Sequence, residues 1–174
     1  PKFEKGALEI LKEKKNLRLL ETNVIKKLKN KLDLRKVTGG ILVQNDPGTE
    51  LNEKSLKAVT KRKPTKDEIK SLLFAWKVNK HVKSNSVVFV KDDVTVGIGA
   101  GQMSRVDAVN LAIMKNGDKI KNSVMSSDAF FPFRDGVDEA AKAGVTAIIQ
   151  PGGSIRDEEV IQAANEHNIA MVFT

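Results

Sequence analysis

The sequence predicts an α/β protein built around a mixed β-sheet. Strand-like and helix-like patterns alternate along the chain, as in sheets that are covered by helices. Apolar runs at 87–90 and 95–98 flank Lys91-Asp92-Asp93, which indicates a hairpin and therefore an antiparallel pair in a partly parallel sheet. The length of 174 residues is enough for one domain or a tightly joined pair of subdomains.

The first fifty residues predict short elements. Ala7, Leu8 and Leu11 share one face of an expected amphipathic helix. The expected elements are a helix over 4–15, a strand over 17–20, a strand over 36–44 that Gly39-Gly40 interrupts, and a turn at Asp46-Pro47-Gly48.

A strong helix is expected after Pro64. Thr65 and Glu68 have the spacing of a capping box, in which each residue satisfies a free backbone N–H of the first turn. The following apolar residues have the i, i+3, i+4, i+7 spacing of one buried face: Ile69, Leu72, Leu73 and Trp76.

The second half repeats the alternation. Ser104 and Asp107 form another capping pair, and Val106, Val109 and Ile113 are expected to face the core. Further along we expect a strand over 124–126, a helix over 135–143 ended by Gly144, a strand over 145–149, a helix over 157–166 and a strand over 170–173.

Composition excludes several classes of protein. The chain has no cysteine, which rules out disulfide scaffolds, Cys-ligated zinc, iron–sulfur clusters and thiolate nucleophiles. With two histidines, a His-rich metal site is not expected, and we predict no bound metal. No apolar run reaches the roughly 18 residues of a membrane span. The N-terminus has no secretory pattern, so we expect a cytoplasmic protein with no membrane partner.

Charge is unevenly distributed. Residues 1–83 carry 22 Lys and Arg against 10 Asp and Glu, whereas residues 84–174 carry 8 against 12. The basic half suits either a nucleic-acid or polyanion surface or a lysine-rich solvated face. We favour the solvated face, because 24 of the 30 cations are Lys and aromatic residues are scarce in that half.

Three strand-to-helix turns are candidates for chemistry, because ligands of such sheets bind beyond the carboxyl ends of strands. The first is the glycine-rich segment 97–105, which offers close backbone approach, a helix N-terminus and the cation of Arg105. It suits a phosphate or carboxylate, or it is a tight structural turn. Gln102 replaces the third glycine of the dinucleotide fingerprint, and no P-loop Gly-Lys-Ser/Thr follows.

The second candidate is 126–135, where three phenylalanines surround Pro132. They can wall a pocket for a flat heterocycle, with Asp128 and Asp135 accepting hydrogen bonds from ring N–H or amino groups. The alternative is packing of a helix start against the core, which we expect to explain at least one Phe.

The third candidate is Pro151-Gly152-Gly153-Ser154, either a ligand-facing helix N-terminus or a turn capped by Ser154. Lys80-His81 suggests acid–base chemistry, but it also suits the end of a helix, where cations complement the dipole.

Together these motifs resemble one family. Four segments carry the resemblance: Lys-Ser-Asn-Ser at 83–86, Gly-Ile-Gly-Ala-Gly-Gln-Met-Ser-Arg at 97–105, the segment 126–135, and Pro-Gly-Gly-Ser-Ile-Arg-Asp at 151–157. The chain resembles the C-terminal part of the bifunctional AICAR transformylase/IMP cyclohydrolases, most closely from Thr65 onward. The resemblance implies a three-layer α/β/α, cytidine deaminase-like fold. It implies a homodimer with active sites at the subunit interface, and formyl transfer from the co-substrate 10-formyltetrahydrofolate to AICAR in purine biosynthesis.

The resemblance also implies roles for individual residues. Asn85 corresponds to a residue near the reacting centre and is the catalytic candidate. The implied AICAR contacts are Asn85, Arg105 and Phe130. The implied folate contacts are Val106, Pro132, Phe133, Asp135, Ser154 and Ile155.

The chain also departs from the family pattern. The family's catalytic Lys-His pair lies upstream, so Lys80-His81 is not assigned catalysis. The cyclohydrolase domain has no counterpart, and we expect residues 1–174 to be the C-terminal subdomain of the transformylase domain, inactive alone. The alternatives are a non-catalytic nucleotide- or folate-binding module and a basic RNA-binding domain, although nucleic acid is not the expected partner.

Overall fold

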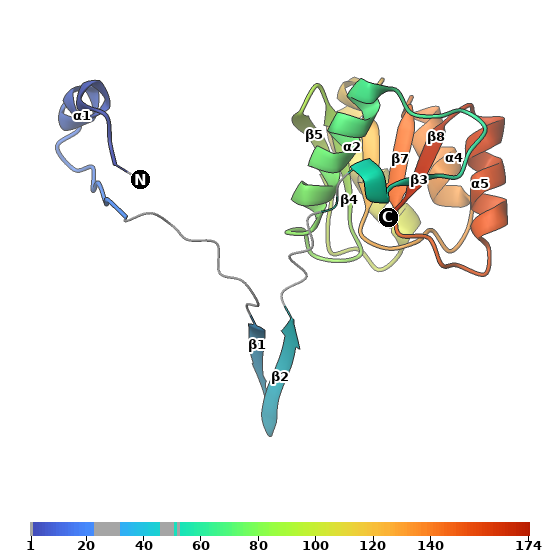
Figure 1. The fold of residues 1–174 in the computed structure, drawn as a ribbon, viewed down its shortest axis with the longest axis horizontal. Coiled ribbons are helices and arrows are strands. Elements are labelled where there is room, and N and C mark those ends of the chain that lie inside the picture. The colour runs from blue at the N-terminus through green and yellow to red at the C-terminus, as the bar shows by residue number, and fades with distance from the viewer. Residues whose placement is uncertain (1, 23–31, 46–50, 52) are drawn as a thin grey trace. The chain divides into compact units, whose positions relative to one another are not determined.

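The computed structural model describes residues 2–22, 32–45, 51 and 53–174. The chain divides into two compact units, residues 1–49 and 50–174, which we describe separately (Figure 1). Within the described residues, no helix is long and apolar enough to cross a bilayer.

The first unit contains the helix α1 (Lys5–Lys12) and a hairpin of β1 (Leu32–Val37) and β2 (Gly40–Asn45). The helix is shorter than expected, and the strand expected over 17–20 is wrong, because these residues pair with no strand among the described residues. The Leu17 N–H instead donates to the Lys14 carbonyl at 3.0 Å. The strand expected over 36–44 is instead this hairpin, whose turn uses Gly39 at φ +82°. The turn expected at Asp46-Pro47-Gly48 lies outside the described residues.

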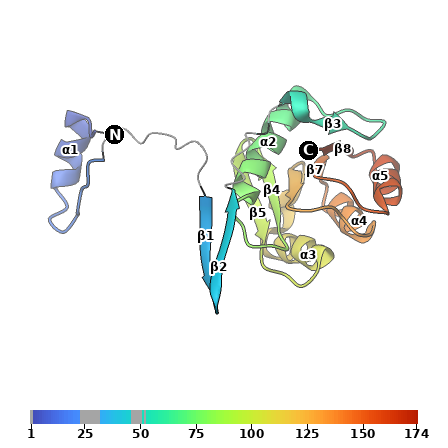
Figure 2. The same ribbon diagram turned by 60° about the horizontal axis from the view of Figure 1, so that its bottom comes forward.

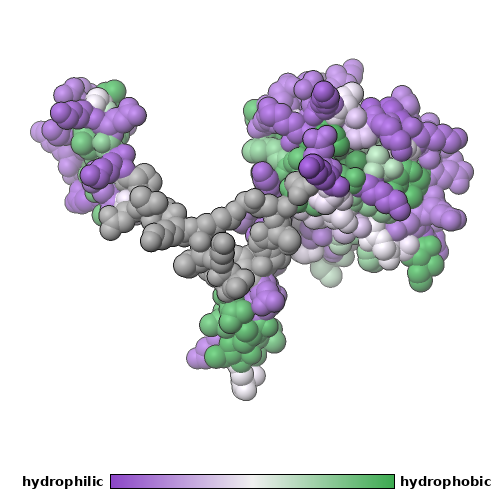
Figure 3. All heavy atoms as spheres, in the orientation of Figure 1, coloured by the Kyte–Doolittle hydropathy of each residue, from purple (hydrophilic) through white to green (hydrophobic). Residues whose placement is uncertain are grey.

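The hairpin carries aliphatic side chains on its surface (Figure 3). The antiparallel register places Leu34 opposite Val43, and Leu32 and Ile41 fall on the same face. All four are more than half exposed. This face is therefore an uncovered apolar surface of the unit. A two-stranded hairpin gains little stability alone in water.

The second unit is a six-stranded mixed sheet in the order β3-β8-β7-β6-β4-β5 (Figure 2). The strands are β3 (Lys57–Ala58), β4 (Val87–Lys91), β5 (Val94–Gly99), β6 (Val124–Ser127), β7 (Ala147–Gln150) and β8 (Ala170–Phe173). β6, β7 and β8 are parallel, whereas β4 runs antiparallel to both β5 and β6. The expected hairpin and mixed sheet are therefore confirmed.

Helices cover both faces of this sheet. They are α2 (Lys66–Asn79), α3 (Arg105–Asn116), α4 (Asp135–Lys142) and α5 (Asp157–Glu166), with short 3₁₀ turns η1 (Glu53–Ser55) and η2 (Gly117–Ile120). Alternate side chains of β4 show which helices lie on which face of the sheet. Phe89 packs in the cluster that contains residues of α3, α4 and α5, whereas Val88 and Val90 pack in the cluster that contains residues of α2. The layers are thus α2, the sheet, and the other three helices.

The capping box of α2 is present, with the Glu68 N–H donating to Thr65 Oγ1 at 3.1 Å and the Thr65 N–H donating to Glu68 Oε2 at 2.8 Å. Glu68 also accepts two hydrogen bonds from Arg62, whose Nη2 additionally donates to the Thr146 carbonyl. The expected buried face is only partly right: Leu72 is buried, whereas Ile69, Leu73 and Trp76 are half-buried. Shorter side chains take the remaining buried positions, namely Ser71, Ala75 and Asn79.

Close packing of α3 on β5 depends on Gly99. A Cβ added there would lie 1.8 Å from the Ala108 carbonyl oxygen, so helix and strand touch backbone to backbone. Val109 is buried on the face turned to the sheet, as expected, but Val106 is half-buried and Arg105 is buried instead. The position after the Ser104 cap therefore holds an inward-facing cation.

Two expected helix ends can be compared with the structure. Gly144, at φ +84°, follows the end of α4 as the expected left-handed residue. Of the two alternatives for the turn before α5, the one capped by Ser154 is confirmed in part: the Ser154 hydroxyl accepts from the Arg156 N–H at 3.1 Å, although Arg156 rather than Ser154 is the N-cap residue of the helix. The carboxylate of Asp157 accepts from the backbone N–H groups of Gly153 at 2.7 Å and Ser154 at 3.1 Å.

The Arg62–Glu68 pair makes stability depend on pH. Burial raises the pKa of Glu68, but hydrogen bonds from Arg62 and Thr65 outweigh it, and the net pKa lies below its ordinary value. We expect Glu68→Gln to cost about 1–3 kcal/mol at pH 7, the worth of hydrogen bonds to a charged group. This difference should vanish as pH falls from the ordinary glutamate range through the lowered pKa. Urea unfolding of both proteins at several pH values measures it, and a pH-independent difference contradicts the prediction.

The Gly99 contact predicts strong intolerance to a side chain. Gly99→Ala should destabilise the second unit by at least about 2 kcal/mol, because the clash is with backbone and cannot be relieved by a rotamer change. Gly40→Ala is the matched control, since a Cβ there meets nothing within 4 Å. Equal urea midpoints for the parent and Gly99→Ala would overturn this account.

Candidate functional site

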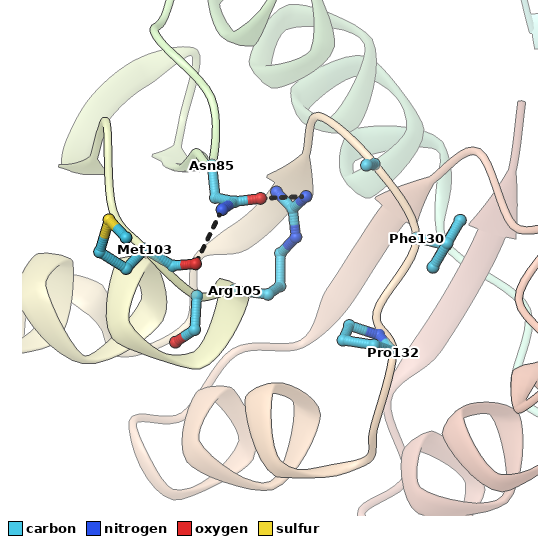
Figure 4. A pocket seen from close by; sticks show the side chains of 7 residues that line it. Asn85, Met103, Arg105, Phe130 and Pro132 are labelled. Carbon is cyan, nitrogen blue, oxygen red and sulfur yellow. Dashed lines mark hydrogen bonds between the residues drawn. The ribbon is translucent and has the colours of Figure 1, made fainter.

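A pocket of about 360 Å³ lies where three segments meet at one edge of the sheet (Figure 4). Because β4 is antiparallel to β5 and β6, its beginning adjoins their carboxyl ends. The lining residues are Asn85, Met103, Ser104, Arg105, Ala129, Phe130 and Pro132. A second hollow of about 520 Å³ lies along α5 and contains none of the sequence-predicted site residues, so the first pocket is the candidate site.

Arg105 is the charged group of this pocket and is only 7% exposed. Its Nη1 donates to the Ser86 carbonyl at 3.2 Å and to Asp128 Oδ1, and its Nη2 donates to Asn85 Oδ1 at 3.1 Å. Its Nε is buried and has no hydrogen-bond partner among the described residues. A buried N–H without a partner is costly, so a ligand acceptor at this atom would be stabilising.

Asn85 is held by the glycine-rich turn. Its Nδ2 donates to the carbonyl oxygens of Gln102 at 2.9 Å and Met103 at 3.3 Å, while its Oδ1 faces Arg105 (Figure 4). The backbone adds a further link, since the Gln102 N–H donates to the Asn85 carbonyl at 3.3 Å. The turn therefore fixes the orientation of the Asn85 amide.

Asp128 balances the charge of Arg105. Burial raises the pKa of Asp128, but hydrogen bonds from the Ser84 side chain, the Ser86 backbone and Arg105 outweigh it and keep the pKa below its ordinary value. Asp128 is therefore ionised near neutral pH and forms an ion pair with Arg105. In this structure the Asp128 carboxylate therefore pairs with a protein group, and the Arg105 cation in the pocket is compensated.

A second surface lies on the other part of the loop after β6. The guanidinium of Arg156 lies 4.7 Å from the centroid of the Phe133 ring, which joins this loop to the turn before α5. Ile155 is fully exposed beside Arg156, and Phe133 is 47% exposed. This second wall, formed by Phe133, Ile155 and Arg156, is exposed and lies outside the lining of the 360 Å³ pocket.

The three phenylalanines have different environments. Phe131 is fully buried, and its backbone N–H donates to Gln150 Oε1 at 2.8 Å, so it anchors the loop in the core as expected for at least one Phe. Phe130 and Phe133 stay exposed by 41% and 47% on either side of it. The anchor explains how one short loop presents rings to two surfaces.

The structure brings four predicted site residues together in the pocket: Asn85, Arg105, Phe130 and Pro132. The remaining predicted residues lie outside its lining: Val106, Phe133, Asp135, Ser154 and Ile155. Asp135 is exposed and accepts from the Gly136 N–H at 2.7 Å. Sequence reasoning did not single out Met103, Ser104 or Ala129 as lining residues, although all three lie inside the motifs at 97–105 and 126–135.

Comparison with known proteins gives the family. The model of the AICARFT/IMPCHase bienzyme family matches residues 1–115. The bifunctional purine biosynthesis protein PurH of Magnetococcus marinus is 54% identical over 186 residues, and those of Bacillus thuringiensis and Bacillus cereus are each 55% identical over 174. All three matches cover the whole chain but only 34–35% of the relatives, so the chain spans about a third of their length.

The expected place of the chain within the family is not borne out. We predicted the C-terminal part of the family protein and a resemblance strongest from Thr65 onward. The family-model match lies instead in the N-terminal part of the chain, residues 1–115. That match does not support the C-terminal assignment.

Among solved structures, a chain of Acinetobacter baumannii RibD has a TM-score of 0.40 at 16% identity, covering 59% of this chain and 32% of RibD. A likeness of this size supports no argument, and the cytidine deaminase-like fold is not confirmed by it. The family-model match, in contrast, spans well over half of the chain. The chain belongs to the AICARFT/IMPCHase bienzyme family.

Proposed function

We propose that this chain forms part of an AICAR formyltransferase acting in purine biosynthesis, and that its pocket binds the base of AICAR. The relatives are named as bifunctional purine biosynthesis proteins, which supports the pathway. The observation that carries the substrate assignment is the buried Arg105, whose Nε lacks a partner, in a pocket that Phe130 also lines.

The pocket chemistry suits a flat, neutral ring with a carbonyl group. Asp128 compensates the charge of Arg105, so a neutral acceptor gains a hydrogen bond there without competing with a second anion. Phe130, Pro132 and Met103 supply the apolar contacts of a ring. The base of AICAR, an imidazole with a carboxamide, has this shape and polarity. A volume of about 360 Å³ lies at the low end for ligand sites and suits one substrate rather than two.

The co-substrate 10-formyltetrahydrofolate is proposed to bind at the second wall, formed by Phe133, Ile155 and Arg156, with Ser154 as a neighbouring contact on the resemblance alone. The ring of Phe133 and the exposed Ile155 offer area for the flat rings of a folate, and Arg156 adds a cation for its carboxylates. The two substrates would then lie on either side of the loop that Phe131 anchors. Val106 and Asp135 remain proposed folate contacts on the resemblance alone.

In the proposed reaction, the amino nitrogen of AICAR attacks the formyl carbon carried by the folate. A bond from that nitrogen to the formyl carbon forms, the bond from the formyl carbon to the folate nitrogen breaks, and a proton passes from the amine to the folate nitrogen. Asn85 and Arg105 would orient the base. The described residues that line the pocket include no histidine, carboxylate or lysine side chain, so the proton acceptor is not supplied by this lining.

Family membership also supports three further proposals. They are a homodimer with its sites at the subunit interface, a cytoplasmic location, and a cyclohydrolase activity carried by other parts of a bifunctional enzyme.

Binding of AICAR tests the substrate assignment. Titration calorimetry of the chain with AICAR should show binding, and Arg105→Gln should weaken it by at least about tenfold, the worth of one hydrogen bond to a charged group. Arg134→Gln is the matched control, because Arg134 also pairs with a carboxylate, Asp138, but lies outside the pocket. Equal AICAR affinity in all three proteins would sink the assignment.

Catalysis is tested separately. We expect the purified 174-residue chain to produce no tetrahydrofolate from AICAR and 10-formyltetrahydrofolate, because its pocket lining holds no group to accept the proton. Formation of tetrahydrofolate is followed by absorbance, and the Bacillus cereus relative serves as the positive control. Measurable formyl transfer by the chain would contradict this expectation.

A further inference from the structure

Asp128 lies just beyond β6 and binds the segment that precedes β4. Its backbone N–H donates to the Ser86 carbonyl at 3.2 Å, and its Oδ1 accepts from the Ser86 N–H at 3.1 Å. The same Oδ1 accepts from Arg105 Nη1. Asp128 itself does not line the pocket, whereas Arg105 and the following Ala129 do.

The contacts continue from Arg105 to Asn85. Arg105 donates through Nη1 to the Ser86 carbonyl and through Nη2 to Asn85 Oδ1, and Asn85 donates in turn to the Gln102 and Met103 carbonyls. The carboxylate of Asp128 therefore begins a series of hydrogen bonds that orders the Arg105 and Asn85 side chains of the pocket.

The ion pair is needed to keep Arg105 inside. The Arg105 side chain is 6% exposed and that of Asp128 is 18% exposed. A guanidinium loses its hydration on burial, and without a carboxylate partner its long stem allows it to turn back to water. Arg105 would then leave Asn85 Oδ1 and expose its Nε.

We propose that Asp128 is a positioning residue that holds Arg105 and, through it, Asn85 in the arrangement that receives the ligand. The role rests on the proposed function for the identity of that ligand, AICAR. A purely structural role explains the contacts less well, because four residue pairs of the β4–β6 ladder, from Val87 with Ser127 to Val90 with Val124, already join the same two segments.

The test compares Asp128→Asn with Asp138→Asn in the full 174-residue chain. Asparagine keeps an oxygen for the Ser86 N–H but removes the charge that holds Arg105. Asp138 is the matched control: it also pairs with an arginine, Arg134, at 2.8 Å, and its side chain is 25% exposed, outside the pocket. Two readouts are measured: the hydrogen-exchange rate of the Arg105 Nε–H by NMR, and the affinity for AICAR by titration calorimetry.

We expect Asp128→Asn to raise the Nε–H exchange rate and to lower AICAR affinity, each by about tenfold, the worth of one charge-assisted hydrogen bond. Asp138→Asn should change neither. If Asp128→Asn does not fold, Asp128→Glu is measured instead; it keeps the charge but displaces the carboxylate, and the same two changes should appear at smaller size.

The two proposals fail in different ways. An unchanged Nε–H exchange rate in the folded variant overturns the positioning role, whatever binds. If Asp128→Asn raises the Nε–H exchange rate but the unsubstituted chain does not bind AICAR, the positioning role is supported and the proposed substrate is rejected. Faster exchange together with unchanged AICAR affinity overturns the claim that the position of Arg105 matters for that ligand.

Discussion

Burial of the Arg105 guanidinium is the constraint on which the candidate site depends. A charge taken out of water must be paired and hydrogen-bonded, and Asp128, Ser86 and Asn85 meet that requirement. These partners come from two segments that are far apart in sequence, and Arg105 itself lies in a third. Satisfying one side chain therefore holds together the beginning of β4, the beginning of α3 and the end of β6.

The topology of the sheet makes this convergence possible. β4 lies between β5 and β6 and is antiparallel to both, so its first residues reach the edge where its neighbours end. A wholly parallel order would send the beginning of β4 to the opposite edge. A buried polar cluster supports this edge from the α2 side: Asn79 donates to Ser126 Oγ at 3.2 Å and accepts from Ser86 Oγ at 2.8 Å.

Much of the second unit could be predicted from local pattern. The hairpin around Asp92 follows from two apolar β-branched runs, and the start of α2 follows from Thr65 and Glu68, because both signals are contained within a few residues. The buried face of α2 was harder to predict. Ala75 and Asn79 are buried although larger apolar neighbours are only half-buried, because the distance between helix and sheet, which no local pattern records, decides which side chains fit.

The candidate site was predictable as a set of segments rather than as contacts. The motifs drew attention to Asn85, Arg105 and Phe130, and these three do line one pocket. The hydrogen bond between Arg105 and Asn85 depends on strand order, and so does the use of Asp128 as an internal partner of Arg105. The strand expected over 17–20 failed for a related reason: an apolar run becomes a strand only where a neighbouring strand offers hydrogen bonds.

The backbone contact between Gly99 and Ala108 has a consequence for which ligands the pocket can accept. No side chain separates α3 from β5 at Gly99, so the helix that carries Arg105 cannot move closer to the strand. The opposite wall is pinned at Phe131. A cavity with two stiff walls discriminates by shape, rejecting rings with an added substituent instead of adapting to them. Adjustment is left to Met103, an unbranched thioether side chain that is 94% exposed at the rim.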